Sequence, residues 1–346
     1  MNGEEKFEIQ IGETRELVRR TDRKIDLVER LLAGLPTSTE IKRSASGIEG
    51  AHAGEERRFG GIQMVWCPPG EFLMGSPEGE VWCPPGEFLL GSQAIKEERI
   101  DSERQHPVQL SRGFWLAKHE CTQWQWERVM GTDVEDLKRT GRYTFGEVTA
   151  KGADIAMYFV SWDDTQAWLK KMNENHPLPE GWEWILPTEA QWEYACRAGT
   201  TTTLYSGSLE VKGERNAPAL DAIAWYGGNS SVGYTGDGFD TSGWPEKQYP
   251  DGKAGVREVG GKLPNAWGLY GMIGNVWEWC EDWYGDYPSG RVTDPTGTHD
   301  FFIRVLRGGG WEAIARHCRS AHRHGDGQDS RGDDLGFRPA AAPSVR

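Results

Sequence analysis

ILPTEAQWEYACRAGT, residues 185–200, is the stretch of sequence that says most about the fold. It begins with a capping box, Thr188-Glu-Ala-Gln191, in which the threonine hydroxyl reaches the third amide of a helix and the glutamine side chain reaches back. Trp192 and Cys196 then lie four residues apart on one helix face, and Gly199 provides a stop. The stretch predicts a short helix with one buried side.

Two further capping boxes predict helices of the same kind. Thr122-Gln-Trp-Gln125 opens a helix that ends near Gly131, and Ser161-Trp-Asp-Asp164 opens one that runs to about Asn175. The buried stripe predicted for the second of these helices is Trp162, Trp168, Leu169 and Met172. The rest of the chain is short apolar stretches and long Gly/Pro loops, without strand–helix–strand alternation. An α+β fold that is irregular and rich in loops is therefore predicted.

Composition and charge narrow the class of protein. The chain has 17 Trp and 45 Gly in 346 residues, which suits a loop-rich fold in which indoles fill the gaps between irregular segments. A net charge of −14 argues against a nucleic-acid binder, which needs a basic face. No apolar run approaches the ~20 residues of a membrane span, and the first residues lack the pattern of a signal peptide. We expect a cytoplasmic protein with reduced cysteines that binds neither nucleic acid nor membrane.

The N-terminal part is predicted to form an amphipathic helix, residues 1–36, followed by a flexible linker. Apolar residues recur every seven positions and the remaining faces are mostly charged, which is a coiled-coil pattern carried by Ile11, Val18, Ile25, Leu32, Thr14, Thr21, Val28 and Leu35. We expect self-association or partner docking through residues 9–35; the alternative is a helix lying on its own domain. Residues 37–60 are polar, rich in Gly and Ser, and without periodicity, so they are predicted as the linker.

An internal repeat follows. VWCPPGEFLMGSPEGE (65–80) is succeeded directly by VWCPPGEFLLGSQ (81–93). A 16-residue period that occurs only twice is too short for a solenoid. Each copy has two apolar strands around a Pro-Pro-Gly turn, so the copies could form successive hairpins. We favour a local tandem duplication over residues 65–93, with one copy in the fold and the other forming an extra loop or hairpin.

The order of these segments resembles the formylglycine-generating enzyme/sulfatase-modifying factor family. The matching stretches lie at residues 64–76, 106–131, 160–173, 185–200, 266–284, 304–309 and 335–339. They place a domain of that type over residues 61–340. The resemblance implies a fold of the enlarged, irregular C-type-lectin kind.

The enzymes of that family hold copper with two cysteines five residues apart, shortly after a Gly-Gly pair; thiolates are soft ligands that suit Cu(I). The corresponding segment here, residues 308–318, contains only Cys318, which fits neither metal position. We therefore predict no catalytic residues and a ligand-binding protein, with Cys318 as a small buried residue. The alternatives are a cysteine oxidase of the formylglycine-generating type that uses other residues, and a scaffold that acts through the N-terminal coiled coil.

The tail alternates scaffold-like residues, such as Trp311, Leu335 and Phe337, with chemically assorted ones. It resembles family members diversified by retroelements, whose R-G-G-x-W-x-x-x-A-R-x-C-R-S-A-x-R spacing recurs from Arg307 to Arg323. The resemblance implies an exposed surface that binds a protein or another macromolecule. The candidate ligand-binding residues are Glu312, Ala313, Ile314, His317, His322, His324, Asp326, Gln328, Asp329, Ser330, Gly332, Asp333 and Asp334. Most of these residue types can arise from an asparagine codon with randomised adenines, although glutamate and glutamine cannot.

A structural calcium ion is the one cofactor that the resemblance implies. The segment 271–278 matches the family's calcium loop, and its candidate ligands are the carbonyls of Gly274 and Val276 and the carboxylate of Glu278. Gly271 stands where the family usually has Asn or Asp. Because calcium takes about six to eight oxygen ligands, this is a partial set. Three nearby histidines, His317, His322 and His324, lack the carboxylate spacing of an iron site.

Overall fold

The computed structural model describes residues 47–77, 103–250, 252–297 and 302–344. The chain divides into two units, Met1–Ile48 and Glu49–Arg346, and every described helix and strand belongs to the second. The predicted helix over residues 1–36 and the second copy of the duplication, residues 81–93, lie outside the described residues.

Short strands and a few helices alternate irregularly along this unit. The strands are β1 (Glu56–Phe59), β2 (Ile62–Cys67), β3 (Gly70–Met74), β4 (His106–Leu110), β5 (Phe114–Ala117), β6 (Tyr143–Phe145), β7 (Trp182–Ile185), β8 (Phe239–Asp240), β9 (Lys253–Ala254), β10 (Trp277–Trp283), β11 (Val292–Thr293), β12 (Ile303–Arg307), β13 (Arg323–Gly327), β14 (Ser330–Gly332), β15 (Leu335–Gly336) and β16 (Ala340–Pro343). The helices are α3 (Gln123–Met130), α4 (Val134–Thr140), α5 (Trp162–Asn175) and α6 (Glu189–Arg197), with 3-10 turns η1 (Pro218–Leu220) and η2 (Ala315–His317). This is the mixed, loop-rich α+β class predicted from the sequence.

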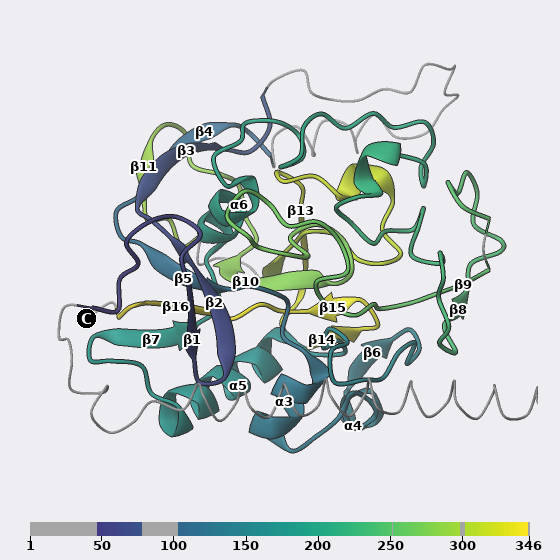
Figure 1. The fold of residues 1–346 in the computed structure, drawn as a ribbon, viewed down its shortest axis with the longest axis horizontal. Coiled ribbons are helices and arrows are strands. Elements are labelled where there is room, and N and C mark those ends of the chain that lie inside the picture. The colour runs from purple at the N-terminus through teal and green to yellow at the C-terminus, as the bar shows by residue number, and fades with distance from the viewer. Residues whose placement is uncertain (1–46, 78–102, 251, 298–301, 345–346) are drawn as a thin grey trace, which may run out of the picture. The chain divides into compact units, whose positions relative to one another are not determined.

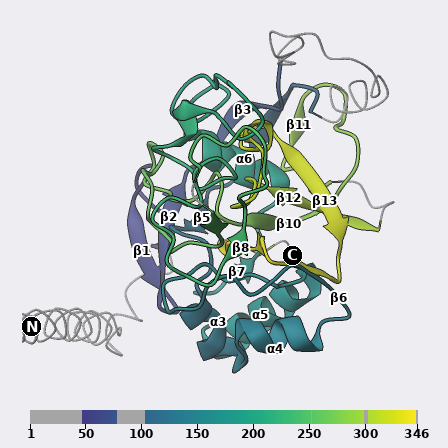
Figure 2. The ribbon, with the colours of Figure 1, turned by 90° about the vertical axis from the view of Figure 1, so that its right-hand side faces the viewer.

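Two sheets position the C-terminal segment. In the first, of order β1-β2-β5-β16-β7, the last strand β16 pairs with both β5 and β7. The second has the order β13-β12-β10-β15 and contains the segment in which the candidate residues lie. Figure 1 shows β16, in yellow, running through the middle of the first sheet, and Figure 2 shows β12 and β13 beside β10. The tail is thus built into both sheets.

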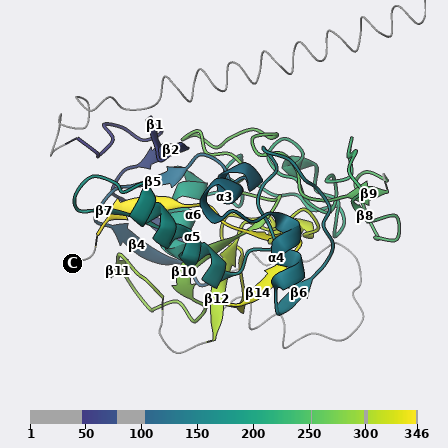
Figure 3. The same cartoon turned by 90° about the horizontal axis from the view of Figure 1, so that it is seen from below.

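The predicted capping boxes are confirmed at α3, α5 and α6, where hydroxyl and side-chain partners both bond as expected. α3 ends at Gly131, which has the left-handed conformation, and α6 ends one residue before Gly199, at a left-handed Ala198. In α5, the predicted stripe is buried except for Trp162, which is half-buried and whose Nε1 donates to the carbonyl of Cys280 at 3.0 Å. Helices α3, α4 and α5 lie together (Figure 3).

Two sequence predictions need correction. β2 and β3, which flank the Pro-Pro-Gly turn, do not form a hairpin: β2 pairs with β1 and β5, while β3 pairs with β4. The predicted linker 37–60 ends too late, because β1 already belongs to the first sheet. Its alternate residues Arg57 and Phe59 cover the buried Trp115, with the Phe59 ring centroid 5.3 Å away. The sequence of β1 is mostly charged, so this strand at the edge of the sheet was not predicted.

Indoles fill much of the interior, as the composition indicated. The fully buried ones include Trp115, Trp126, Trp168, Trp184, Trp192, Trp279 and Trp311. Within the described ranges, no helix is long and apolar enough to cross a membrane.

Candidate ligand-binding site

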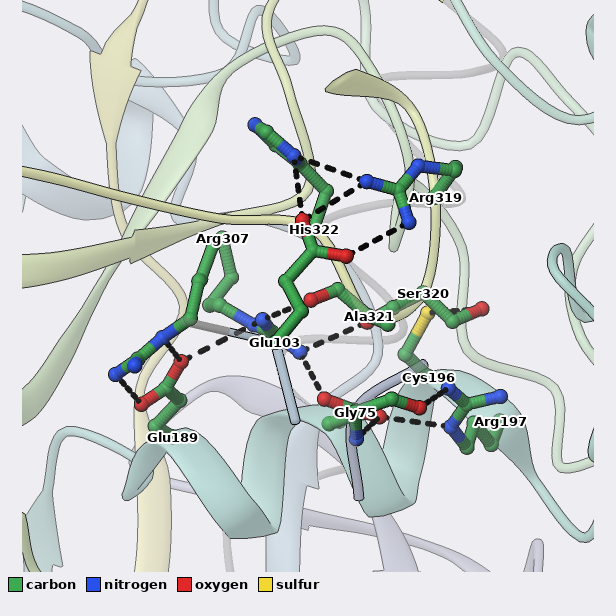
Figure 4. A network of polar contacts seen from close by, with 12 residues as sticks. Gly75, Glu103, Glu189, Cys196, Arg197, Arg307, Arg319, Ser320, Ala321 and His322 are labelled. Carbon is green, nitrogen blue, oxygen red and sulfur yellow. Dashed lines mark hydrogen bonds and ion pairs between the residues drawn. The ribbon is translucent and has the colours of Figure 1, made fainter. Parts of the chain in front are cut away.

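Buried ion pairs fix the C-terminal segment to α6. Glu189 and Glu193 project from this helix, and both are buried. Arg307 at the end of β12 pairs with Glu193 and has its Nη1 3.4 Å from a Glu189 oxygen, while the Nη2 of Arg323 lies 2.6 Å from the other oxygen of Glu189. Figure 4 shows Arg307 beside Glu189. Salt bridges therefore attach two strands of the second sheet, β12 and β13, to helix α6.

Arg307 also holds the loop between β12 and β13. Its guanidinium donates to the carbonyls of Ser320 at 2.8 Å and Ala321 at 2.9 Å (Figure 4). Its side chain is 0% exposed, so these charge-assisted bonds form away from water. The backbone that leads into β13 is fixed by them.

A second cluster of charged side chains surrounds the buried His322. Its Nδ1 lies 3.2 Å from a Glu103 oxygen, and Glu103 accepts two bonds of 2.8 Å from Arg319. Burial first, and then the charge of Arg319, lower the pKa of His322 to about 4 against the opposing effect of Glu103. Although burial acts in the opposite direction, the bonds from His322 and Arg319 hold the pKa of Glu103 well below its usual range. His322 is thus a neutral structural residue.

The candidate residues divide into three groups by exposure. Those that the structure buries are Ala313, His322, Gly332, Asp333 and Asp334; the half-buried ones are Ile314, His317, Asp326, Gln328 and Ser330; the exposed ones are Glu312, His324 and Asp329. The prediction that all of them share an exposed face is therefore wrong for the first group. The predicted anchors Trp311, Leu335 and Phe337 are buried, as expected.

Local packing gives the reason for the buried members. Ala313 sits in a turn, its amide bonded to the carbonyl of Gly310 and its carbonyl bonded by Gly227. Gly332 pairs with Phe145, and a Cβ at Gly332 would meet the Phe145 ring at 2.4 Å. Asp333 accepts the amide of Glu147 at 3.0 Å. These positions hold loops together.

The three candidate histidines lie around the ring of Trp277. Its ring centroid lies 6.2 Å from that of His317, 5.8 Å from that of His322 and 5.3 Å from that of His324. The His317 and His322 rings stack at 4.6 Å. Of these three histidines only His324 is exposed. Among the residues that the structure describes, no group of three His, Cys, Asp or Glu is placed to hold a metal ion.

The turn between β13 and β14 presents the next set of candidates. Asp326 Oδ1 accepts the amide of Gly327 at 2.7 Å and the hydroxyl of Ser330 at 3.0 Å. The carbonyl of Gln328 accepts the amide of Asp163, in the first turn of α5, at 3.2 Å. The turn is thereby docked on that helix, and it leaves Asp329 exposed.

Three carboxyl groups lie close together at the start and end of the segment. Asp334 is 5% exposed; burial first, and then the nearby Glu312 and Asp333, raise its pKa well above the usual range. Glu312 is exposed as a residue, yet desolvation of its carboxyl group and the charge of Asp333 raise its pKa to about 7. Burial and mutual repulsion therefore favour the neutral forms of Glu312 and Asp334 over their charged forms.

Aromatic residues that the sequence analysis did not single out border these carboxyls. Trp244 stacks on Trp311 with ring centroids 5.9 Å apart, and Phe239 stacks on Trp244 at 6.1 Å. Phe239 is 44% exposed and Trp244 half-buried. Phe239 and Trp244 belong to a Gly-rich stretch far from Trp311 in sequence. Nothing in the composition of that stretch predicts that it packs against Trp311.

The calcium ligands predicted from the resemblance do not fit this structure. Both carboxylate oxygens of Glu278 are engaged by the fully buried Arg338, at 2.7–3.2 Å, and one also accepts Trp192 Nε1 at 2.7 Å. A cation at Glu278 would therefore face a fixed guanidinium. At Gly271 a Cβ would meet the Glu120 carboxylate at 2.4 Å, so a longer side chain has no room there. We assign no role to the carbonyls of Gly274 and Val276.

Cys318 is fully buried, and desolvation raises the pKa of its thiol to about 12. The five described cysteines are all buried and free. A buried thiol with a raised pKa is a poor source of the thiolate that binds metal or reacts. The segment has no second cysteine beside it.

The chain is similar in sequence to known proteins. The family model described as "Sulfatase-modifying factor enzyme 1-like domain" matches residues 50–343. The "Formylglycine-generating enzyme" of Mus musculus is 34% identical over 188 residues, which is 53% of this chain and 43% of that protein. The "Serine/threonine-protein kinase pkn1" of Chlamydia caviae is 27% identical over 286 residues, 80% of this chain and 38% of that protein. The chain thus spans less than half the length of either relative.

Among solved structures, "Treponema denticola variable protein 1" superposes with a TM-score of 0.60 at 23% identity, covering 84% of this chain and 99% of that one. At this level of identity the likeness concerns the fold.

Proposed function

We propose, from the premise that this chain belongs to the sulfatase-modifying factor enzyme 1-like family, that it is a binding protein whose C-terminal segment contacts a macromolecular ligand, a protein above all. The domain would present that segment as C-type-lectin-like proteins do. We propose further that the segment is of the kind diversified by retroelements. The activities of the relatives named above belong to proteins more than twice as long as the region matched here.

One observation carries the proposal. Glu312, His324 and Asp329 are exposed on a segment whose backbone is fixed from beneath by buried ion pairs. A binding surface needs side chains that reach the ligand and a backbone that loses little freedom on binding. Changes at the exposed positions can alter the ligand without disturbing the fold, because surface substitutions away from caps and cores usually cost within about ±0.5 kcal/mol.

The alternative activity, cysteine oxidation of the formylglycine-generating type, has less support. It requires a pair of accessible thiols, and Cys318 is single in its segment and fully buried. We therefore favour binding over catalysis.

A display library of random peptides, panned against the purified chain, tests the proposal. The variant Glu312→Ala/His324→Ala/Asp329→Ala should lose the selected binders while its melting temperature stays within a few degrees of the unsubstituted chain. A library that yields no binder sensitive to this variant would contradict the proposal.

The matched control is Glu174→Ala/His176→Ala/Glu210→Ala. It removes similar groups from exposed positions outside the C-terminal segment. It should retain every selected binder. At the gene, a reverse transcriptase and a near-copy of the 3′ coding region beside it would support diversification.

A further inference from the structure

The tandem duplication contains the sequence of one strand twice. β3 and the two residues after it read GEFLMGS (70–76), and residues 86–92 read GEFLLGS. The two stretches differ only at the fifth position, where Met74 corresponds to Leu90. The first stretch lies within the described residues and the second lies outside them. The contacts of β3 therefore show what the second stretch needs in order to form the same strand.

The backbone pairing of β3 sets no condition that the second copy fails to meet. β3 pairs antiparallel with β4 along its whole length, from Gly70 opposite Leu110 to Met74 opposite His106. Residues 86–90 contain no proline that would remove a backbone donor. Met74 is 2% exposed, and a change from Met to Leu is among the best tolerated in a core, because the two side chains have similar volumes.

The side-chain contacts of β3 are made by residues that both copies share. Gly70 has no room for a side chain, because a Cβ would meet the hydroxyl oxygen of Tyr194 at 2.2 Å. Glu71 forms an ion pair of 2.7 Å with Arg291, and the ring centroid of Phe72 lies 5.3 Å from that of Tyr194. At these three positions the second copy has the same residue types, as Gly86, Glu87 and Phe88.

Gly75, directly after β3, is the position that tolerates a side chain least. Its φ is +93°, and a Cβ would meet the carbonyl oxygen of Glu103 at 2.4 Å. Its amide donates to Glu193 at 2.9 Å, and its carbonyl accepts a bond of 3.1 Å from Arg197 (Figure 4). The position thus requires glycine both for its conformation and for its closeness to other backbone. The second copy has Gly91 here.

The chain connections also permit an exchange of the two copies. Because β2 and β3 belong to different sheets, β2 can keep its place while the second copy takes the place of β3. The connection from β2 would then lengthen from residues 68–69 to residues 68–85. The connection to Glu103 would shorten from residues 77–102 to residues 93–102. The entropic cost of closing a flexible loop grows slowly with its length, so the exchange is permitted, while the short Pro-Pro turn favours the first copy.

We propose that the second copy can replace the first as β3, so that the domain has two states that differ in which end of β3 carries the longer connection. In the first state the longer connection leads to Glu103, which bonds Arg319 and His322 of the C-terminal segment. In the second state the connection to Glu103 is shorter by one repeat, and the additional residues lie between β2 and β3. The exchange does not depend on the binding function proposed above.

Hydrogen exchange of the full chain, followed by mass spectrometry of its peptides, tests the exchange of copies. The variants are Gly75→Val, Gly91→Val and the two combined, and peptides of the two copies differ in mass through Met74 and Leu90. In the unsubstituted chain and in Gly91→Val, we expect slow exchange at residues 71–75. In Gly75→Val the slow exchange should move to residues 87–91. A mere loss of stability would leave both copies exchanging fast.

Urea unfolding of the same variants gives a second measurement. Gly75→Val should lower the urea midpoint by less than half as much as the double variant does, because the second copy can take over. The control is Gly274→Val, at a glycine with φ +83° whose Cβ would meet the carbonyl oxygen of Trp225 at 2.2 Å. The segment around Gly274 occurs once in the sequence, so this variant shows how far such a clash lowers the midpoint without a second copy.

Three results would overturn the proposal. Gly75→Val could fail to fold or could unfold at the midpoint of the double variant. Residues 87–91 of Gly75→Val could exchange as fast as they do in the unsubstituted chain. The double variant could be as stable as the unsubstituted chain, which would mean that β3 does not need this glycine.

Discussion

Arg307→Met tests whether buried charge pairs hold the binding segment in place. Arg307 is 0% exposed, and it bonds Glu193, two loop carbonyls and, at 3.4 Å, Glu189. Removing one partner of a buried ion pair costs about 3–5 kcal/mol, because an uncompensated charge remains. Glu193 would keep its bond to Arg197 Nε at 2.9 Å, and Glu189 would keep Arg323. We therefore expect about 3 kcal/mol, at the lower end of that range.

The measurement is urea unfolding followed by tryptophan fluorescence, with Arg112→Met as the control. Arg112 is exposed, so its substitution should change the free energy of unfolding by no more than about 0.5 kcal/mol. Hydrogen exchange should quicken at the amides of Ser320 and His322, near the released carbonyls. A loss below about 1 kcal/mol, with exchange unchanged there, would refute the idea that Arg307 fixes this segment.

Four further predictions concern the stability, the chemistry and the assembly of the chain. Trp311→Ala should cost about 3–5 kcal/mol of stability in urea unfolding, since the indole is 0% exposed; a loss under about 1 kcal/mol would mean that the site is not packed as described. Burial raises the pKa of Asp282 from 3.8 to about 8, so the folded chain binds more protons than the unfolded chain between these values and loses stability as pH rises. In unfolding series from pH 5 to 8, Asp282→Asn should reduce that loss by up to about 1 kcal/mol per pH unit; identical slopes would contradict this. The purified chain should neither bind Cu(I) tightly nor oxidise a peptide with a sulfatase motif, and turnover that Cys318→Ser abolishes would disprove the binding role. Deleting residues 1–40 should leave the second unit folded but alter assembly; unchanged light scattering and partner pull-down would mean that the predicted helix only lies on its own domain.

Local hydrogen-bond chemistry made three helices predictable. Thr188 and Gln191 satisfy each other's backbone amides within four residues, so the signal needs no knowledge of the rest of the fold. α4 was missed although it has the same device, because its box is built from two aspartates, Asp133 and Asp136, and the helix is only seven residues long with two apolar positions, Val134 and Leu137.

Sheet pairing was less predictable, because it depends on partners far away in sequence. β1 reads as a charged segment, and only its contact with Trp115 shows why Arg57 and Phe59 alternate inward. The pairing of β2 and β3 also depends on distant strands. The residues of these two strands permit a hairpin, but β2 pairs with β5 and β3 pairs with β4 instead.

The candidate site was predictable as a segment but not residue by residue. The varied residue types in the C-terminal segment indicate which side chains are candidates for ligand contact. Whether each of these side chains is exposed depends on neighbours from other parts of the chain, which the sequence of the segment does not show. His322 is buried because Glu103 and Arg319 supply its partners, and Glu103 lies more than two hundred residues earlier in the chain. His324, the second residue of β13, is exposed as a residue although its ring centroid lies 5.3 Å from that of Trp277. Strand alternation does not separate the two histidines, because His322 precedes the strand and residues two apart share a face; the partners Glu103 and Arg319 make the difference. The same logic explains why Trp244 was overlooked: it lies beside the candidate segment because it stacks on Trp311, which comes from a different part of the sequence.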